Sequence, residues 1–423
     1  MKRMKDAVSH PRRRNFLAAA GLAGAAGFGG MAGGAAAPAR GEPEPWDEVP
    51  FYGPHQAGIT TPMQQSLYFA SFDLTAASRT TLIEMLRGWT VAAARLTAGQ
   101  PLGQDESPQD PPRDSGEAAG LGPRRLTLTF GFGPEMFSLQ GQDRYGIAPL
   151  RPAALADLPR FPGDQFVAGR SGGAVCIQAC ADDPQVAFHA VRQLARISYG
   201  AARLRWVQTG FSTAGKTPGT PRNLLGFKDG TMNPTGASVG PAVWAGAEGP
   251  PWMRGGSYMV ARRIRIALEH WDRMSVGFQE RTIGRRKQSG APLTGKAEFD
   301  PPDFAAADAD GNTVIPENAH MRLAAPASND GATLLRRSYS YDDGASFTAE
   351  RWPPWRQAIE YDAGLFFQCF QKDPRSAFIP VFDRLARFDA LNQFTTHVGG
   401  AIFACPPGVA REGGYVGQTL FEA

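Results

Sequence analysis

In the first half of the chain, short runs of alternating apolar and polar residues are separated by segments with helical spacing. Residues 125–133 place four apolar side chains at alternate positions, which is typical of a strand with one buried face. Ser78 and Asp183 each precede an apolar stripe of helical period, and both residue types cap helices. We expect strands at residues 66–72, 125–133, 174–181 and 204–211, with helices after Ser78 and Asp183. The predicted order is βαββαβ.

The second half repeats this order. We expect strands at residues 257–267, 333–341, 364–371 and 398–405, with helices marked by Trp271 and Phe278 and opened by Pro374. Two βαββαβ halves predict an α+β protein made of two ferredoxin-like units whose sheets pack face to face. We place the halves at residues 40–225 and 226–423. Residues 281–322 show turn chemistry throughout, and so long an irregular interval in a compact domain is usually functional.

Residues 1–39 differ in composition from the rest. Arg13-Arg14-Asn15-Phe16-Leu17 is a twin-arginine pattern, and a weakly apolar run rich in Ala and Gly follows it. Ala37-Pro38-Ala39 offers a cleavage site. These features predict a signal peptide for export of the folded protein to the periplasm or another extracytoplasmic space, and no stable membrane anchor.

The basic charge of the chain belongs to this segment. Six basic residues against Asp6 give residues 1–39 a net charge of +5, so the whole-chain value of +4 leaves −1 for the remainder. Nothing in that balance indicates a nucleic-acid partner. Four cysteines in a chain of this length form no disulfide framework. Cys176 and Cys180 lie too far apart along one predicted strand to bridge, and pairing of Cys369 with Cys405 stays open.

The stretch Gly226-Phe227-Lys228-Asp229-Gly230-Thr231-Met232-Asn233-Pro234, here called the signature loop, combines several turn signals. Glycine has no Cβ, so its backbone adopts positive φ and approaches a flat ligand closely. The loop therefore presents one carboxylate, Asp229, beside bare backbone. Read alone, Lys-Asp-Gly is most often an ordinary surface turn.

The signature loop resembles that of the dye-decolourising haem peroxidases. Four further segments resemble the same family in the same order, namely residues 53–59 (GPHQAGI), 284–293 (GRRKQSGAPL), 320–323 (HMRL) and 335–341 (LRRSYSY). The similarity is strongest to an exported subgroup linked to iron uptake, the deferrochelatase/peroxidases. It implies a duplicated fold of the dimeric α+β barrel type, haem b as cofactor, a homodimer, and a possible iron-transport partner protein.

The six histidines are the candidates for an axial haem ligand, which is usually a neutral imidazole in peroxidases. His10 lies in the signal peptide, His189 is expected to be solvated, and His270 and His397 are expected to have packing roles. A binding role for His55 stays open. His320 is expected in a loop ahead of an apolar strand, and its resemblance to the family's axial-ligand segment implies that it binds the iron. Glu298, Asp300 and Asp303 are the candidates for its carboxylate partner.

The resemblance also implies a catalytic pair on the other face of the haem. Asp229 would move a proton between the two oxygens of hydrogen peroxide, and Arg336 would stabilise the developing charge. Strand alternation sends Arg337 to the opposite face from Arg336. Gly230, Thr231 and Met232 would contact the macrocycle. Relatives often continue the His320 segment with Asn-Pro-Arg, whereas this chain has Ala325-Pro326-Ala327, which predicts a lost propionate contact. Haem would then be held less tightly, or by Arg285 instead.

Three functions fit these residues. The first is an exported haem b peroxidase that reduces hydrogen peroxide and oxidises aromatic or dye-like donors. The second is a deferrochelatase that removes iron from haem and leaves the porphyrin intact. The third is a periplasmic haem carrier, although a carrier gains nothing from a paired acid and guanidinium.

Overall fold

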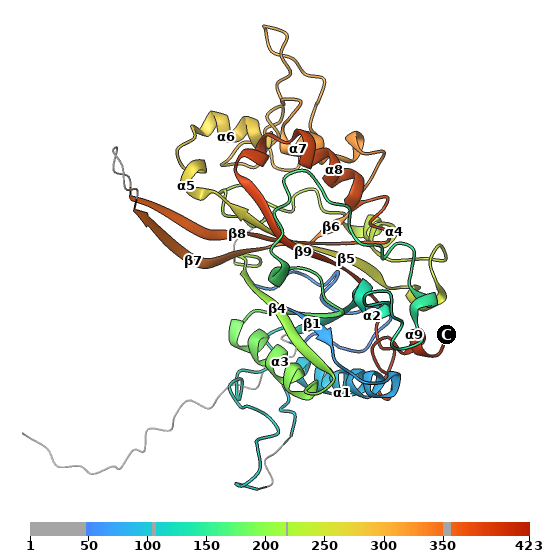
Figure 1. The fold of residues 1–423 in the computed structure, drawn as a ribbon. Coiled ribbons are helices and arrows are strands. Elements are labelled where there is room, and N and C mark those ends of the chain that lie inside the picture. Colours follow the sequence, from blue (N-terminus) through green and yellow to red (C-terminus); the bar gives the residue numbers. More distant parts are fainter. Residues whose placement is uncertain (1–47, 104–106, 217–218, 350–356) are drawn as a thin grey trace, which may run out of the picture. The chain divides into compact units, whose positions relative to one another are not determined.

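The computed structural model describes residues 48–103, 107–216, 219–349 and 357–423 (Figure 1). The predicted signal peptide lies outside these residues. These described residues form one compact unit. Within the described part of the chain, no helix has the length and apolar character needed to cross a membrane.

The first half has the predicted βαββαβ order. Its elements are β1 (Ser66–Leu74), α1 (Arg79–Thr97), β2 (Thr127–Phe132), β3 (Val175–Ala181), α3 (Pro184–Ile197) and β4 (Ala202–Phe211). The strands pair antiparallel in the order β2-β3-β1-β4. Ser78 caps α1 by accepting from Thr81 N, and Asp183 caps α3 by accepting from Gln185 N and Val186 N. Both predicted helix starts are therefore confirmed.

The second half has the same order with one interruption. Its strands are β5 (Ser257–Ile266), β6 (Leu335–Arg336), β7 (Tyr339–Ala349), β8 (Gln357–Gln371) and β9 (Thr395–Cys405). The prediction of one continuous strand at residues 333–341 is wrong. Two separate strands, β6 and β7, lie there, and Arg337-Ser338 separates them. Both pair with the same edge of β8.

The helices of the second half are shorter than the sequence predicts. They are α5 (Leu268–Trp271), α6 (Val276–Ile283), α7 (His320–Leu323) and α8 (Phe378–Phe388). The sequence predicted one helix around Trp271 and Phe278, but two short helices, α5 and α6, lie there. Gly284 ends α6 at φ 90°, a conformation that favours glycine. The helix expected from Pro374 begins four residues later, at Phe378. Short helices at Pro134–Phe137 (α2), Val239–Val243 (α4) and Gln418–Phe421 (α9) complete the set of α-helices in the described residues.

The two four-stranded sheets close into one antiparallel barrel of eight strands, with β6 as an added piece on β8. Single residue pairs join the halves at two seams, Phe132 with Ala404 and Phe211 with Ser340. Apolar side chains, among them Phe69, fill the interior. The predicted face-to-face sheets and barrel fold are confirmed.

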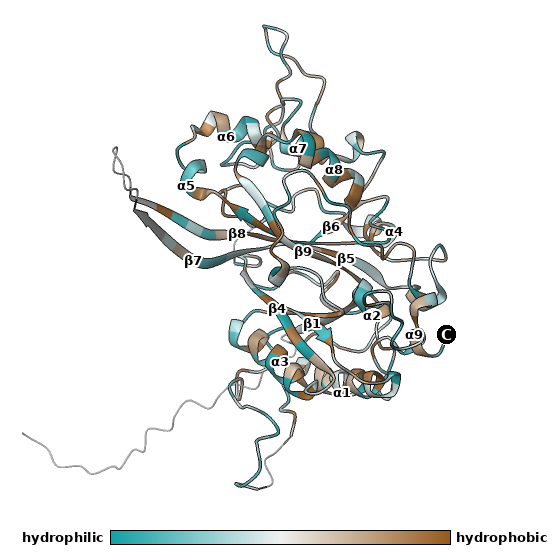
Figure 2. Ribbon diagram, in the orientation of Figure 1, coloured by the Kyte–Doolittle hydropathy of each residue, from teal (hydrophilic) through white to brown (hydrophobic). Residues whose placement is uncertain are grey.

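Helices cover the outer faces of the barrel. α1 and α3 lie against the first sheet, whereas α7 and α8 lie over the second (Figure 1). Figure 2 shows both hydrophobic and hydrophilic residues on α1 and α3, as expected of helices with one buried face. All four cysteines are buried and free, so Cys369 and Cys405 do not form a disulfide.

Candidate haem site

A cavity of about 250 Å³ lies between the second sheet, α7, α8 and the signature loop, and we call it the His320 cavity. Most of its lining is apolar. Apolar lining residues include Leu225, Phe227, Ile264, Ile266, Ile283, Phe304, Phe367, Phe378, Val381 and Leu385. Of the residues expected at the haem, the lining includes Asp229, Gly230, Thr231, Met232, His320, Ala325, Pro326 and Arg336 but not Ala327. Such a pocket suits a flat apolar ligand with a few polar groups.

His320 is the first residue of α7 rather than a loop residue. Its Nδ1 lies 2.6 Å from Asp389 Oδ2, and the Asp389 side chain is only 4% exposed. Burial alone would lower the pKa of His320, but the charge and hydrogen bond of Asp389 outweigh it, so the pKa is raised. The carboxylate fixes the ring tautomer, because Nδ1 carries the shared proton. Nε2 has no hydrogen-bond partner among the described residues and is free to bind a metal.

The predicted carboxylate partners of His320 are wrong. Glu298 binds Lys228 Nζ and accepts from Thr231 Oγ1 at 3.0 Å. Asp300 accepts from the backbone of Lys296 and Ala297, and Asp303 accepts from Ala305 and Ala306. Asp389 follows α8 and lies 69 residues from His320 in sequence, so only the tertiary structure brings them together. Its cap on the short helix Ala390–Gln393 was the only local signal.

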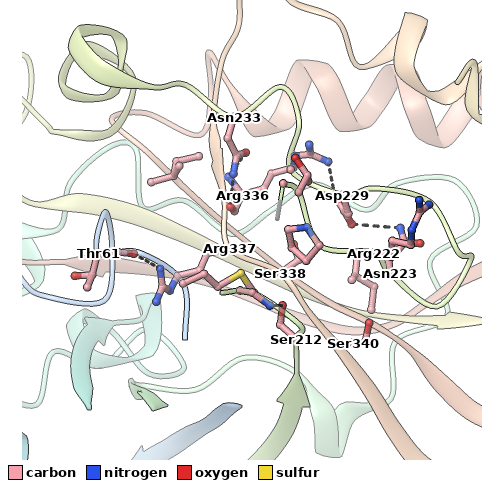
Figure 3. A pocket seen from close by; sticks show the side chains of 18 of the residues that line it. Thr61, Ser212, Arg222, Asn223, Asp229, Asn233, Arg336, Arg337, Ser338 and Ser340 are labelled. Atoms are coloured by element: carbon pink, nitrogen blue, oxygen red, sulfur yellow. Dashed lines mark hydrogen bonds and ion pairs between the residues drawn. The ribbon is translucent and has the colours of Figure 1, made fainter. Parts of the chain in front are cut away.

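Asp229 and Arg336 form an ion pair with 2.9 Å between Oδ1 and the guanidinium nitrogen Nη1 (Figure 3). The two residues line the His320 cavity and also a second cavity of about 370 Å³. This second space, here called the polar cavity because more polar side chains line it, has a mixed lining. Its polar residues include Thr61, Ser212, Arg222, Asn223, Ser338 and Ser340, and its apolar residues include Ile59, Met63, Phe211 and Leu365. The acid–guanidinium pair thus stands between the mostly apolar His320 cavity and a second cavity whose lining mixes polar and apolar side chains.

Arg337 points away from that pair. Its guanidinium is buried and donates to Thr61 O (Figure 3). It also donates to Gln64 Oε1. Arg337 lines the polar cavity only, whereas Arg336 lines both. The structure therefore places Arg336, and not Arg337, at the His320 cavity.

Glu298 anchors the signature loop. Hydrogen bonds from Lys228, Thr220 and Thr231 outweigh the effect of burial and hold the pKa of this carboxyl below its usual value. Glu298 therefore stays ionised and binds Lys228 and Thr231, which lie on either side of Asp229 in the loop. Gly230 adopts φ 117° within the loop, a backbone conformation that L side chains rarely reach.

Arg285 supplies a buried cation to the cavity. One of its terminal nitrogens donates to Gly290 O at 2.7 Å and to Glu298 O at 2.9 Å. The other, Nη2, is buried and has no partner among the described residues. A buried unpaired guanidinium N–H is costly, and a carboxylate such as a haem propionate would satisfy it. The cavity thus fits haem: an apolar lining, a free imidazole nitrogen and a donor for a propionate.

The remaining histidines have other surroundings. The prediction that His189 is solvated is wrong, because it is 5% exposed and its ring nitrogens lie 3.5 Å from Asp114 and 3.3 Å from Glu117. His55 stacks on Trp244, with 3.8 Å between ring centroids. His397 lines the His320 cavity, and burial together with the Arg262 charge lowers its pKa to about 3. His270 lies in α5.

Arg262 is a cavity residue that the sequence analysis missed. It is fully buried on β5, pairs with Asp164, and lies within 6 Å of four phenylalanine rings, the nearest being that of Phe382 at 4.5 Å. The only signal in the sequence was a charged residue at a position of the predicted strand where the alternation calls for an apolar one.

The comparisons with known proteins agree with this geometry. Residues 56–212 match the family described as Dyp-type peroxidase, N-terminal, and residues 220–410 match Dyp-type peroxidase, C-terminal. The chain is 37% identical over 436 residues to a deferrochelatase of Yersinia pestis, covering 99% of this chain and 96% of the relative. It is 41% identical over 387 residues to a dye-decolorizing peroxidase of Thermobifida fusca, covering 87% and 84%.

Solved structures of Dyp-type peroxidases are also similar to this chain. A DyP-type peroxidase from Streptomyces coelicolor superposes with a TM-score of 0.80 at 42% identity, covering 89% of this chain and 97% of that one. Ferric DtpA from Streptomyces lividans has the same TM-score, identity and coverage. The family expected from five sequence segments is therefore confirmed, and this chain belongs to the Dyp-type peroxidases.

Proposed function

We propose that this chain is an exported haem b peroxidase that reduces hydrogen peroxide and oxidises aromatic or dye-like donors. The observation that carries the proposal is the Asp229–Arg336 ion pair beside a cavity that also presents the free Nε2 of His320. Haem, when bound, would supply the redox-active iron for this chemistry. The other tasks fall to the side chains of the protein.

Each side chain has a distinct task in this proposal. His320 binds the iron through Nε2, and Asp389 holds its ring and keeps it electron-rich. Asp229 takes a proton from one oxygen of peroxide and delivers it to the departing oxygen. Arg336 stays protonated at any working pH and stabilises the negative charge that develops as the O–O bond breaks. Arg285, whose buried Nη2 has no partner among the described residues, would bind a propionate.

The polar cavity supports a route for peroxide. Peroxide is small and makes hydrogen bonds, and the mixed lining of this cavity includes hydroxyl, amide and guanidinium groups as well as Asp229. The proposal also includes cleavage of the signal after Ala39, twin-arginine export and a homodimer. These rest on the sequence pattern and the resemblance described above.

Absorption spectroscopy tests the proposal. We expect purified protein, reconstituted with haem, to show a haem band that changes within milliseconds of mixing with peroxide and returns when an aromatic donor is added. A protein that binds no haem would refute the peroxidase and every other haem function. A protein that binds haem but shows no spectral change with peroxide would instead support a carrier.

A second function, deferrochelatase, is favoured by the relatives of that name at 37% identity over nearly the whole chain. It would use the same cavity with haem as substrate. Metal-free porphyrin has a characteristic fluorescence, so incubation of the protein with haem separates the two functions. Release of porphyrin without added peroxide would favour the deferrochelatase.

A further inference from the structure

The side chain of Asn233 forms two hydrogen bonds with the backbone of one residue, Arg336 (Figure 3). Asn233 Nδ2 donates to Arg336 O at 2.8 Å, and Arg336 N donates to Asn233 Oδ1 at 3.0 Å. A side-chain amide that pairs with both polar groups of a peptide residue reproduces the pairing of a neighbouring strand. Asn233 therefore behaves as a one-residue strand beside β6.

This contact matters because β6 contains only Leu335 and Arg336. One edge of β6 pairs with β8, and on that side Arg337 N donates to Gln368 O. Successive residues of a strand direct their N–H and C=O groups to opposite edges, so those of Arg336 face away from β8. Asn233 supplies the partners on that open edge. Without it the peptide groups of Arg336, a partly buried residue, would lose both hydrogen bonds.

The same contact closes a ring around the proposed proton-transfer site. The chain runs from Asp229 to Asn233, the amide joins Asn233 to the Arg336 backbone, and the Arg336 guanidinium returns to Asp229 Oδ1 at 2.9 Å. Arg336 cannot shift relative to Asp229 without breaking the amide pairing or deforming the loop. Glu298 holds the loop itself through Lys228 and Thr231.

We propose that Asn233 is a positioning residue that registers β6 against the signature loop, and so sets the placement of the Arg336 guanidinium beside Asp229. The proposal rests on the proposed function for its catalytic consequence, but its structural part concerns this chain alone. A structural readout without haem therefore separates the failure of one from the failure of the other.

The structural test is hydrogen–deuterium exchange of the protein without haem, followed at the Arg336 amide. Asn233→Ala removes the acceptor of this N–H, and Asn312→Ala, at an exposed turn, is the matched control. We expect exchange at Arg336 to become about tenfold faster in Asn233→Ala, a typical effect for a lost hydrogen bond, and to stay unchanged in Asn312→Ala. Unchanged exchange in Asn233→Ala would overturn the proposal, whatever the protein does with peroxide.

The catalytic test is a double-mutant cycle on the rate of reaction with peroxide. Asn233→Ala should lower this rate about tenfold when Arg336 is present and by less than about twofold in Arg336→Leu, since a positioning residue acts only through the group that it positions. Equal losses in both backgrounds would indicate general damage and overturn the proposal. If Asn233→Ala does not fold, Asn233→Asp, which keeps one acceptor and loses the donor to Arg336 O, is put through the same cycle and decides by the same criterion.

Discussion

Replacing Asp389 by Asn should loosen haem binding, because the carboxylate makes two different contacts that one amide cannot reproduce. Asp389 Oδ2 bonds His320 Nδ1 at 2.6 Å, and Oδ1 accepts from Leu391 N at 2.8 Å. The amide side chain in Asp389→Asn has only one oxygen, so its nitrogen must face one of two N–H groups. The site is nearly dry, since the Asp389 side chain is 4% exposed.

The size of the effect follows from these contacts. A hydrogen bond to a charged group is worth about 1.5–3 kcal/mol, and one such bond is lost. That range corresponds to about 10–150-fold weaker haem retention, which overlaps the usual effect of about 10–100-fold on removing the partner of a metal-bound His. Loss of the negative charge should also raise the reduction potential of the haem iron, because the imidazole donates less electron density.

The assay is the transfer of haem from the holoprotein to an excess of a high-affinity acceptor, with a spectroelectrochemical titration of the potential. Asp303→Asn is the control, since Asp303 was an equally eligible partner in sequence but caps an exposed turn. Haem loss from Asp389→Asn at the wild-type rate, with an unchanged potential, would refute the reasoning. So would a larger effect of Asp303→Asn.

Three further outcomes are expected. Asp229→Ala should slow the reaction with peroxide by about 10²–10⁴-fold while leaving the resting haem spectrum in place, and loss of haem would instead make the residue structural. Glu298→Gln weakens the pair with Lys228 and should lower the free energy of unfolding by about 1–3 kcal/mol in urea denaturation. Asp383→Asn removes a solvent-exposed ion pair and should leave the free energy of unfolding nearly unchanged; similar losses in both variants would contradict this account. His397 has a pKa of about 3 in the folded protein. At pH values below the ordinary pKa of a histidine, the imidazole of His397 is therefore protonated in the unfolded chain but not in the native state. Its contribution to stability should therefore be lost as pH falls, by about 2 kcal/mol between pH 7 and 5, and His397→Leu should remove this component from denaturation curves of the protein without haem; identical pH dependence in both proteins would show that His397 is not held neutral.

Local patterns were sufficient for much of the fold. Ser78 and Asp183 cap helices because each side chain reaches backbone N–H groups two or three residues ahead, a contact set within one turn. Alternation identified most of the strands, because one face of each is buried whatever the partner. The predictions failed where contacts with residues distant in sequence determine the local structure or the burial of a side chain. The strand expected at residues 333–341 breaks at Arg337-Ser338, and the face of His189 that looked solvated is covered by a loop carrying Asp114 and Glu117.

The sequence by itself determined the two βαββαβ halves, the signature loop and the family, since these depend on residue order and short-range chemistry. Only the tertiary structure decided which carboxylate holds His320, that Arg336 reaches Asp229 across 107 positions of sequence, and that Asn233 pairs with the Arg336 backbone. Such contacts arise when the barrel closes. A pattern along the chain records which side chains are buried, but not which distant group each one meets.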